Sequence, residues 1–112
     1  MGSYPSGHTS IGWNWALTLT EIAPDHADAI LQRGRAFGQS RGICGAHWKS
    51  DIESGRIIGA ATFAKLHASP VFMAQMAAAR AEVLRARSQG AAPSPNCAAE
   101  AAALATSSVL AP

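Results

Sequence analysis

Apolar side chains recur at intervals of three and four residues in four separate stretches of this chain, the spacing of helices that bury one face. The first stretch covers about residues 10–23. Part of it alternates as a strand would, but its length and Ala16 favour a helix that is buried on several sides. Pro5 and Ser6 stand just before this stretch, where helix-capping residues belong.

Glycine and proline separate the other three predicted helices. The second helix follows Pro24, a residue suited to the first turn of a helix. Three glycines within residues 38–46 then predict a turn or a short irregular connector. The third helix covers about residues 48–67, and the fourth begins at Ser69-Pro70, an N-cap followed by a proline in the first helical position. No stretch is a convincing strand, so the sequence predicts an all-α fold.

Small residues and an apolar stripe mark the packing faces of the last two predicted helices. Gly55 and Gly59 lie four residues apart, on one side of the third helix, where they would let another helix approach closely. The apolar stripe of the fourth helix is formed by Phe72, Met76, Ala79 and Val83. Both features predict helix-to-helix packing.

Composition narrows the class of protein. The chain has 112 residues and is 48% hydrophobic, enough for one small domain with a core. Only 14% of the residues are charged and the net charge is +2, which is too little to indicate nucleic-acid binding. The longest apolar run, residues 57–64, is far too short to span a membrane, so membrane insertion is not expected. Residues 1–10 lack the basic and apolar regions of a signal peptide.

The composition changes after Ser88. Residues 89–112 are mostly Ala, Ser, Pro and Gly, with Glu100 as the one charged residue. We therefore expect a helical domain over residues 1–88 and a flexible tail over residues 89–112. Within the tail, residues 89–96 resemble a linker and residues 97–110 a weak Ala-rich helix or disorder.

The two cysteines, Cys44 and Cys97, are too few and too far apart for a zinc ribbon or a redox pair. One disulfide between them is an option in an oxidising compartment, and two separate thiols are the alternative. The spacing leaves both open.

Two polar clusters are candidates for chemistry. The first is Pro5-Ser6-Gly7-His8, at the start of the first predicted helix. A helix N-terminus binds anions through unpaired N–H groups and the positive end of the helix dipole. Ser6 adds a hydroxyl, Gly7 permits close approach, and His8 can protonate a leaving group. Taken alone, the tetrapeptide also suits an ordinary turn and helix cap.

The second cluster is Ser40-Arg41, five residues, His47, three residues, Asp51. A guanidinium group fits phosphate oxygens, and a carboxylate four residues after a histidine can hold one ring nitrogen and leave the other as a nucleophile. A surface ion pair or a helix-surface contact would explain either part alone. Together, eight specified residues at roughly 5% each have a chance on the order of 10⁻¹⁰ to 10⁻¹¹ per placement, which favours a phosphoryl-transfer site. The remaining histidines, His26 and His67, have no evident partner.

These two clusters resemble the last two of three signature motifs in the type-2 phosphatidic acid phosphatase superfamily. That superfamily includes bacterial class A non-specific acid phosphatases, lipid phosphatases and vanadium haloperoxidases. The resemblance is greatest to the class A acid phosphatases, through the stretches GSYPSGHTSIGWNWAL, FGQSRGICGAHWKSDIESGR and LHASPVF. It covers about residues 2–85.

The resemblance implies an all-helical bundle of the acid phosphatase and vanadium haloperoxidase type. It also implies phosphomonoester hydrolysis without a metal or other cofactor. In that chemistry His47 is the nucleophile that forms a phosphohistidine, Asp51 orients it, and His8 protonates the leaving group and then activates water. The phosphate oxygens would be bound by Ser6, Gly7 and Arg41. Full-length members are usually periplasmic and often associate as oligomers.

One departure from the family pattern concerns the first of the three motifs, Lys, six residues, Arg-Pro, which is expected upstream of PSGH and occurs nowhere in this sequence. We therefore expect the C-terminal half of the helical domain, with Met1 an internal methionine taken as a start or the gene truncated. Loss of one oxyanion donor typically costs about 10²–10³ in rate, so we expect impaired activity. The third helix would also lack part of its packing without the other half of the core, so we expect the isolated chain to be marginally stable or aggregation-prone.

Three other functions stay open. The chain could be an inactive remnant or an anion-binding module, or a vanadate-dependent haloperoxidase, since the same anion site can hold vanadate. The lack of spanning helices argues against a lipid phosphatase.

Overall fold

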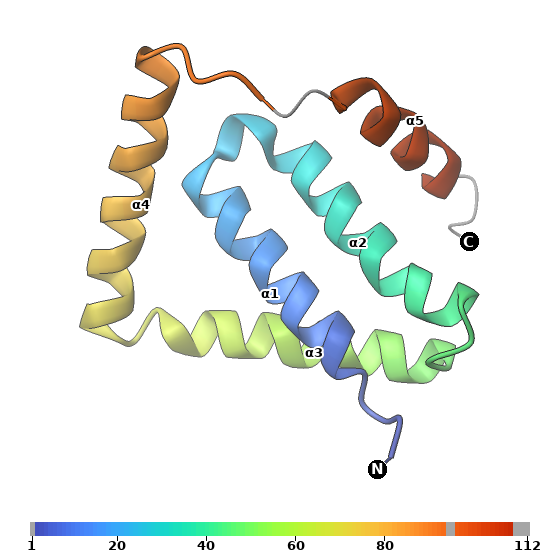
Figure 1. Ribbon diagram of the computed structural model, residues 1–112. Coiled ribbons are helices and arrows are strands. Elements are labelled where there is room, and N and C mark those ends of the chain that lie inside the picture. The colour runs from blue at the N-terminus through green and yellow to red at the C-terminus, as the bar shows by residue number, and fades with distance from the viewer. Residues whose placement is uncertain (1, 94–95, 109–112) are drawn as a thin grey trace.

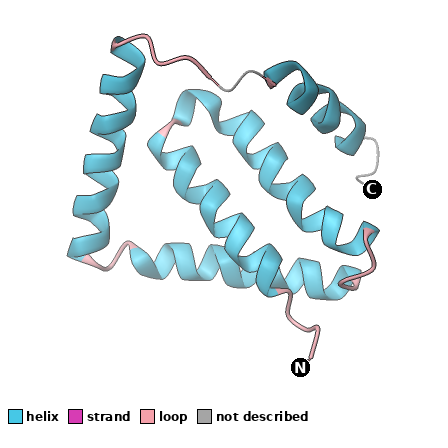
Figure 2. Cartoon of the chain, viewed as in Figure 1, coloured by secondary structure: helices cyan, strands magenta, loops and turns pink. Residues whose placement is uncertain are grey.

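The computed structural model describes residues 2–93 and 96–108, and within these ranges all regular structure is helical (Figure 2). The elements are α1 (Gly7–Ile22), the short 3-10 helix η1 (Pro24–His26), α2 (Ala27–Ile43), α3 (Lys49–Leu66), α4 (Pro70–Ser88) and α5 (Cys97–Ser108). The predicted all-α fold is confirmed.

Helix α1 is the centre of the arrangement. It packs against α2 and α3, and more lightly against α4. Figure 1 shows α1 and α2 side by side and running in opposite directions, with α3 crossing them and α4 leaving α3 at a sharp bend. The beginning of α1, the end of α2 and the beginning of α3 meet at one corner of the molecule (Figure 1). Backbone hydrogen bonds join the three helix ends there.

Side-chain caps start two of the helices where the sequence predicts them. The Ser6 hydroxyl accepts a hydrogen bond from the Thr9 N–H at 3.1 Å, and the Ser69 hydroxyl accepts one from the Phe72 N–H at 3.3 Å. Each hydroxyl satisfies a backbone donor that the helix itself leaves unpaired. Because Ser6 is the cap, α1 begins at Gly7, three residues before the predicted start.

The predicted connector over residues 38–46 is wrong in its first half, because α2 continues to Ile43. Its glycines face neighbouring helices. A Cβ atom at Gly38 would lie 3.0 Å from Thr9 Cγ2, and one at Gly42 would lie 3.1 Å from Ile52 Cδ1. The glycines therefore permit close packing, and the chain turns only at Gly45, whose φ of +76° favours glycine.

The close approach predicted from Gly55 and Gly59 is confirmed. A Cβ atom at Gly55 would lie 2.7 Å from the carbonyl oxygen of Ser6, and one at Gly59 would lie 2.6 Å from that of Ser10. No side chain fits in these gaps, so α1 lies directly on the backbone of α3.

The end of the chain contains one further helix. Residues 97–108 form α5, which contacts α2 through an Arg33–Glu100 ion pair and a hydrogen bond from Gln32 to the Leu104 carbonyl. Residues 109–110 of the predicted stretch lie outside the described residues. Cys44 and Cys97 are both exposed and form no disulfide with each other.

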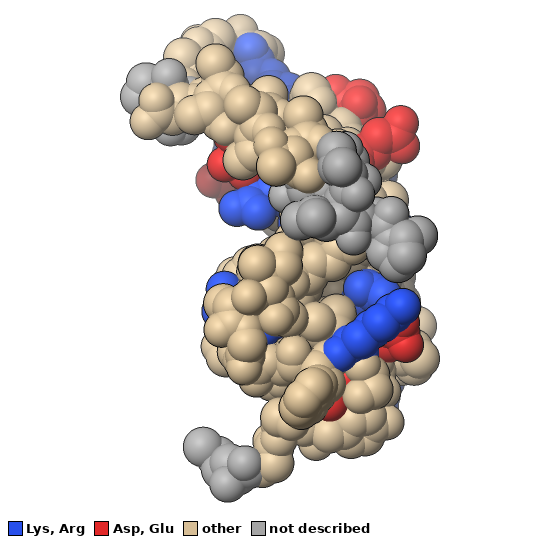
Figure 3. Space-filling view, turned by 90° about the vertical axis from the view of Figure 1, so that its right-hand side faces the viewer, with Lys and Arg blue, Asp and Glu red and all other residues tan. Residues whose placement is uncertain are grey.

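Charged groups are sparse on the face drawn in Figure 3, where Lys and Arg or Asp and Glu form small separate groups among uncharged residues. No single helix in the described ranges is long and apolar enough to cross a membrane. Helices α3 and α4 pass that test of length and composition only as a pair bent by 97°.

Candidate functional site

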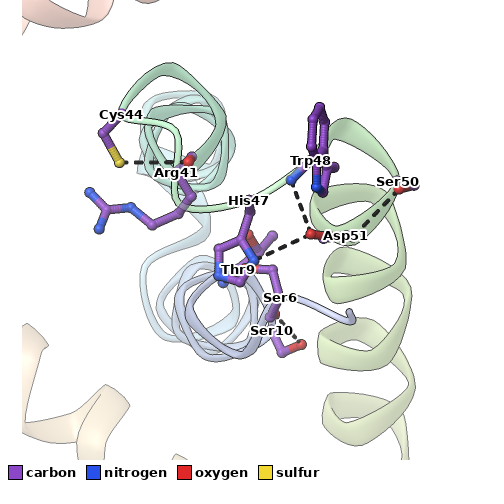
Figure 4. A network of polar contacts seen from close by, with 9 residues as sticks. All are labelled: Ser6, Thr9, Ser10, Arg41, Cys44, His47, Trp48, Ser50 and Asp51. Atoms are coloured by element: carbon purple, nitrogen blue, oxygen red, sulfur yellow. Dashed lines mark hydrogen bonds and ion pairs between the residues drawn. The ribbon is translucent and has the colours of Figure 1, made fainter. Parts of the chain in front are cut away.

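The corner where three helix ends meet is held together by backbone hydrogen bonds. The Ser6 N–H, before α1, donates to the carbonyl of Asp51 in α3 at 3.0 Å. The N–H groups of Ala46 and His47 both donate to the carbonyl of Arg41, near the end of α2. The two sequence clusters, 32 or more residues apart, are thereby brought into one place (Figure 4).

The first turn of α1 is open on one side. Ser6 is fully buried, whereas Gly7 and His8 are exposed. A Cβ atom at Gly7 would meet nothing within 4 Å, so an anion has room to reach the backbone there. This is the environment in which a helix N-terminus binds a negatively charged group.

His47 and Asp51 form a buried pair beside that turn. Nδ1 of His47 lies 3.5 Å from Oδ2 of Asp51, and the two side chains are 12% and 3% exposed. This distance is long for a hydrogen bond, and Nδ1 has no other hydrogen-bond partner among the described residues. A carboxylate facing Nδ1 favours the proton on that nitrogen and leaves the lone pair on Nε2.

The start of α3 keeps Asp51 ionised. The backbone N–H of Trp48 donates to the Asp51 carboxylate at 3.0 Å. This hydrogen bond is the main reason that the pKa of Asp51 lies below its ordinary value, and the Ser3 hydroxyl and His47 act in the same direction against the effect of burial. Asp51 is also the third residue of α3, where the helix dipole favours negative charge.

The two predicted catalytic histidines are neighbours. The ring centroids of His8 and His47 are 5.9 Å apart, with an angle of 62° between the ring planes. One ring comes from the open turn of α1 and the other from the loop before α3. A small anion at this turn would therefore have an imidazole on two sides.

The structure does not bring the Arg41 guanidinium group to the pair. Its Cζ atom lies 5.5 Å from the centroid of the Phe37 ring, and its Nε donates to the Ser40 hydroxyl at 3.3 Å. Figure 4 shows the side chain extending away from His47. Only the backbone of Arg41 takes part in the corner as the structure stands.

Several polar groups at the site were not predicted from the sequence. Thr9 is buried beside Ser6, and its hydroxyl oxygen has no hydrogen-bond partner within the described residues. The Trp48 N–H and the Ser54 hydroxyl, which donates to Tyr4 Oη at 2.9 Å, also belong to the corner. The sequence carries a signal for one of these groups, the Trp48 N–H. An acidic residue at the third helical position, here Asp51, often accepts a hydrogen bond from the N-cap N–H.

The other two histidines lie away from this corner. The expectation that His67 lacks a partner is wrong, because its Nε2 lies 2.8 Å from Oε2 of Glu21 and its Nδ1 lies 2.8 Å from the Phe63 carbonyl oxygen. His26 is exposed and pairs with the adjacent Asp25 at 3.6 Å. Within residues 2–93 and 96–108, no group of three or more His, Cys, Asp or Glu residues could hold a metal ion.

The fold and this corner define an all-helical protein in which a histidine–carboxylate pair faces a helix start suited to anions. Comparison with known proteins agrees with that class. The PAP2 superfamily matches residues 1–78, and the chain belongs to this superfamily.

Three bacterial relatives are similar over most of this chain. The "Acid phosphatase" of Zymomonas mobilis is 55% identical over 86 residues, which are 77% of this chain and 33% of the relative. The "Non-specific acid phosphatase" of Providencia stuartii is 53% identical over 72% of this chain and 33% of its own length. The "Non-specific acid phosphatase" of Salmonella typhimurium is 51% identical over 73% of this chain and 33% of its own length. The chain thus spans about a third of the length of the curated relatives it matches, less than the half suggested by its sequence.

Proposed function

We propose that this chain carries the histidine part of an acid phosphatase site and hydrolyses phosphomonoesters. The observation that carries the proposal is the position of His47, between the Asp51 carboxylate at 3.5 Å and the His8 ring at 5.9 Å, beside the open first turn of α1. The names of the relatives support the same activity.

In this proposal, the phosphate group of the substrate sits at the start of α1. The backbone at Gly7 and the hydroxyl hydrogen of Ser6 bind its oxygens, helped by the helix dipole, while the Ser6 N–H stays on the Asp51 carbonyl. Arg41 is only half-buried, so its long side chain can turn from Phe37 to the bound phosphate. A guanidinium group in that place would stabilise the charge of the transition state.

The reaction proceeds in two displacements at phosphorus. Nε2 of His47 attacks, a P–N bond forms, and the P–O bond to the leaving group breaks as His8 gives that oxygen a proton. His8 then takes a proton from water, whose oxygen attacks phosphorus. The P–N bond breaks and inorganic phosphate leaves. Asp51 holds the Nδ1 proton of His47 throughout and stabilises the positive charge on the ring.

The chain lacks the Lys, six residues, Arg-Pro motif, and we propose that its activity is reduced for that reason. Each missing donor to the transferring phosphoryl group would cost about 10²–10³ in rate. The proposed site uses no metal ion. We further propose a periplasmic location, which cell fractionation would test, and self-association, which sedimentation would test.

The first test is hydrolysis of p-nitrophenyl phosphate at mildly acidic pH by the 112-residue chain and by its His47→Ala variant. His26→Ala is the matched control, because His26 is an exposed histidine away from this corner, whose side chain pairs with the adjacent Asp25. We expect the activity to be lost in His47→Ala and kept in His26→Ala. Equal activity in all three proteins would contradict the proposal.

A second measurement separates hydrolysis from binding alone. Inorganic phosphate should shift the backbone amide NMR signals of Gly7 and His8. Phosphate binding without hydrolysis would favour an anion-binding module. The absence of both binding and hydrolysis would favour an inactive remnant. Bromide oxidation in the presence of vanadate would indicate a haloperoxidase.

A further inference from the structure

The segment before α1 is fastened to a single turn of α3. The Ser54 hydroxyl donates to Tyr4 Oη at 2.9 Å, and the Ser6 N–H donates to the Asp51 carbonyl at 3.0 Å. The two contacts lie three residues apart along α3, so they hold both ends of the segment 4–6. We call these four residues, Tyr4, Ser6, Asp51 and Ser54, the N-terminal clamp.

The packing beneath this clamp restricts the movement of segment 4–6 in one direction, toward α3. Gly55 lies directly beneath, where a Cβ atom would come within 2.7 Å of the Ser6 carbonyl oxygen. That contact limits how closely the segment approaches α3, but it does not stop the segment from sliding or lifting. Hydrogen bonds to α3 resist those movements: the two of the clamp and, just before it, the one between the Ser3 hydroxyl and the Asp51 carboxylate. Of the two in the clamp, the one made by Tyr4 depends on a side chain at both ends.

The position of the segment decides where the first turn of α1 points. No hydrogen bond joins His8 directly to His47 in the described residues; their rings are neighbours because of where the two backbones lie. The same turn of α3 that carries the clamp also carries Asp51, which faces His47. A clamp at this turn therefore fixes the anion-binding end of α1 relative to the nucleophile.

We propose that Tyr4 is a positioning residue, which holds the start of α1 against the His47–Asp51 pair through its hydrogen bond with Ser54. This rests on the proposed phosphatase function. The hydroxyl of Tyr4 pairs with Ser54 and not with a group assigned to phosphate binding, so Tyr4 acts through the backbone of residues 4–6. The residue is 64% exposed, so its ring adds little to the buried core and its hydroxyl is the part that matters.

The test uses the full chain and inorganic phosphate as the probe. Phosphate affinity is measured from the shifts of the Gly7 and His8 amide signals in wild type, Tyr4→Phe and Ser54→Ala. Loss of one hydrogen bond corresponds to about a threefold to tenfold weaker affinity. We expect that loss in each single variant, with thermal unfolding close to that of wild type.

Three further variants distinguish positioning from a general structural effect. The double variant Tyr4→Phe/Ser54→Ala should bind phosphate no more weakly than either single variant, because all three break the same bond. Ser54→Thr keeps the hydroxyl and should restore the affinity. Ser88→Ala is the matched control, since its hydroxyl only donates to the Arg85 carbonyl, at 2.8 Å, in another helix.

The outcomes separate the two proposals. Phosphate binding by wild type that is unchanged in Tyr4→Phe and Ser54→Ala would overturn the clamp and leave the phosphatase proposal standing. Additive losses in the double variant would overturn it as well. If wild type neither binds phosphate nor hydrolyses p-nitrophenyl phosphate, the phosphatase proposal fails and the clamp fails with it.

Discussion

Asp51, the third residue of α3, contacts three different parts of the corner. Its carboxylate accepts from the Trp48 N–H and faces Nδ1 of His47, while its backbone carbonyl accepts from the Ser6 N–H. The first contact keeps the carboxylate ionised, the second orients the imidazole and the third holds the start of α1. One residue thus links the helix cap, the candidate nucleophile and the candidate anion site.

Asp51→Asn should lower p-nitrophenyl phosphate turnover by about 10²–10⁴-fold, since the amide cannot fix the Nδ1 proton or stabilise the charged ring. The ¹⁵N shifts of the His47 imidazole should report the loss of the single tautomer. Asp25→Asn removes an exposed carboxylate that pairs with Arg87 and is the control. A His47 tautomer that is the same in Asp51→Asn and wild type would contradict the assigned role.

The contacts of His67 lead us to expect that the free energy of unfolding depends on pH. The Phe63 carbonyl, and then the Glu21 carboxylate, raise the pKa of His67 above its ordinary value of 6.5. A raised pKa in the folded state means that the contribution to stability is fully present below 6.5 and is lost as the pH rises through the folded value. This contact ties the end of α1 to the end of α3.

The measurement is the thermal midpoint of wild type and Glu21→Gln between about pH 5.5 and pH 9. The variant should be less stable at the low end, and the difference should shrink as the pH rises. Glu53→Gln is the control, because the ion-pair partner of Glu53 is Lys49 and not a histidine. A constant difference for Glu21→Gln across the range would show that His67 does not titrate against Glu21.

At the scale of the elements, the crossing of α1 over α3 depends on the lack of side chains at Gly55 and Gly59. A Cβ atom at either position would lie closer than 3.0 Å to a backbone oxygen of α1 or of its N-cap, Ser6. Backbone atoms cannot rotate aside as a side chain does. The crossing therefore sets the distance between the first turn of α1 and Asp51.

Gly55→Ala should destabilise the fold by about 1–3 kcal/mol, the usual range for overpacking. Alanine gains about 1 kcal/mol of helix propensity over glycine, which offsets part of that loss. Gly42→Ala is the matched control, because its Cβ atom would come closest to the end of the Ile52 side chain, at 3.1 Å, and would lie in ordinary contact with the His47 carbonyl oxygen, at 3.7 Å, so it should cost less. Urea unfolding followed by circular dichroism compares the two, and equal stabilities would contradict the close crossing.

At the scale of the whole molecule, more large apolar side chains are exposed than buried. The buried apolar residues within the described ranges are Ala16, Ala36, Ile52 and Met76. Trp48 is 76% exposed, Ile57 is 70% exposed and Val71 is 68% exposed. The face in Figure 3 carries few charges to keep such surfaces apart. Exposed apolar area of this kind favours association.

We therefore expect the isolated chain to bind a hydrophobic dye such as ANS, to self-associate as its concentration rises, and to unfold over a broad temperature range. Ile57→Thr should reduce dye binding with little effect on stability, whereas Ile52→Thr, at a buried position, should destabilise the fold. Light scattering and thermal melts would measure both. A cooperative melt of a soluble monomer that binds no dye would contradict this expectation.

Much of the fold follows from local sequence. The helical spacing of apolar residues and the caps at Ser6 and Ser69 predict helices at the observed places, because both act over one or two turns. The glycines of α2 misled the prediction, since a glycine that breaks a helix and one that admits a neighbour look alike in sequence. The division of the chain at residue 88 stays a prediction.

Local sequence was enough to predict the helical elements, the PSGH and Ser-Arg-to-Asp motifs, and the pairing of His47 with Asp51, since four residues make one turn of helix. Packing in three dimensions places His8 beside His47, Tyr4 against Ser54 and the Arg41 guanidinium on Phe37. Except for the local stacking of Arg41 on Phe37, these contacts join residues far apart in the chain. They depend on how closely α1 and α3 pack, which local spacing does not specify.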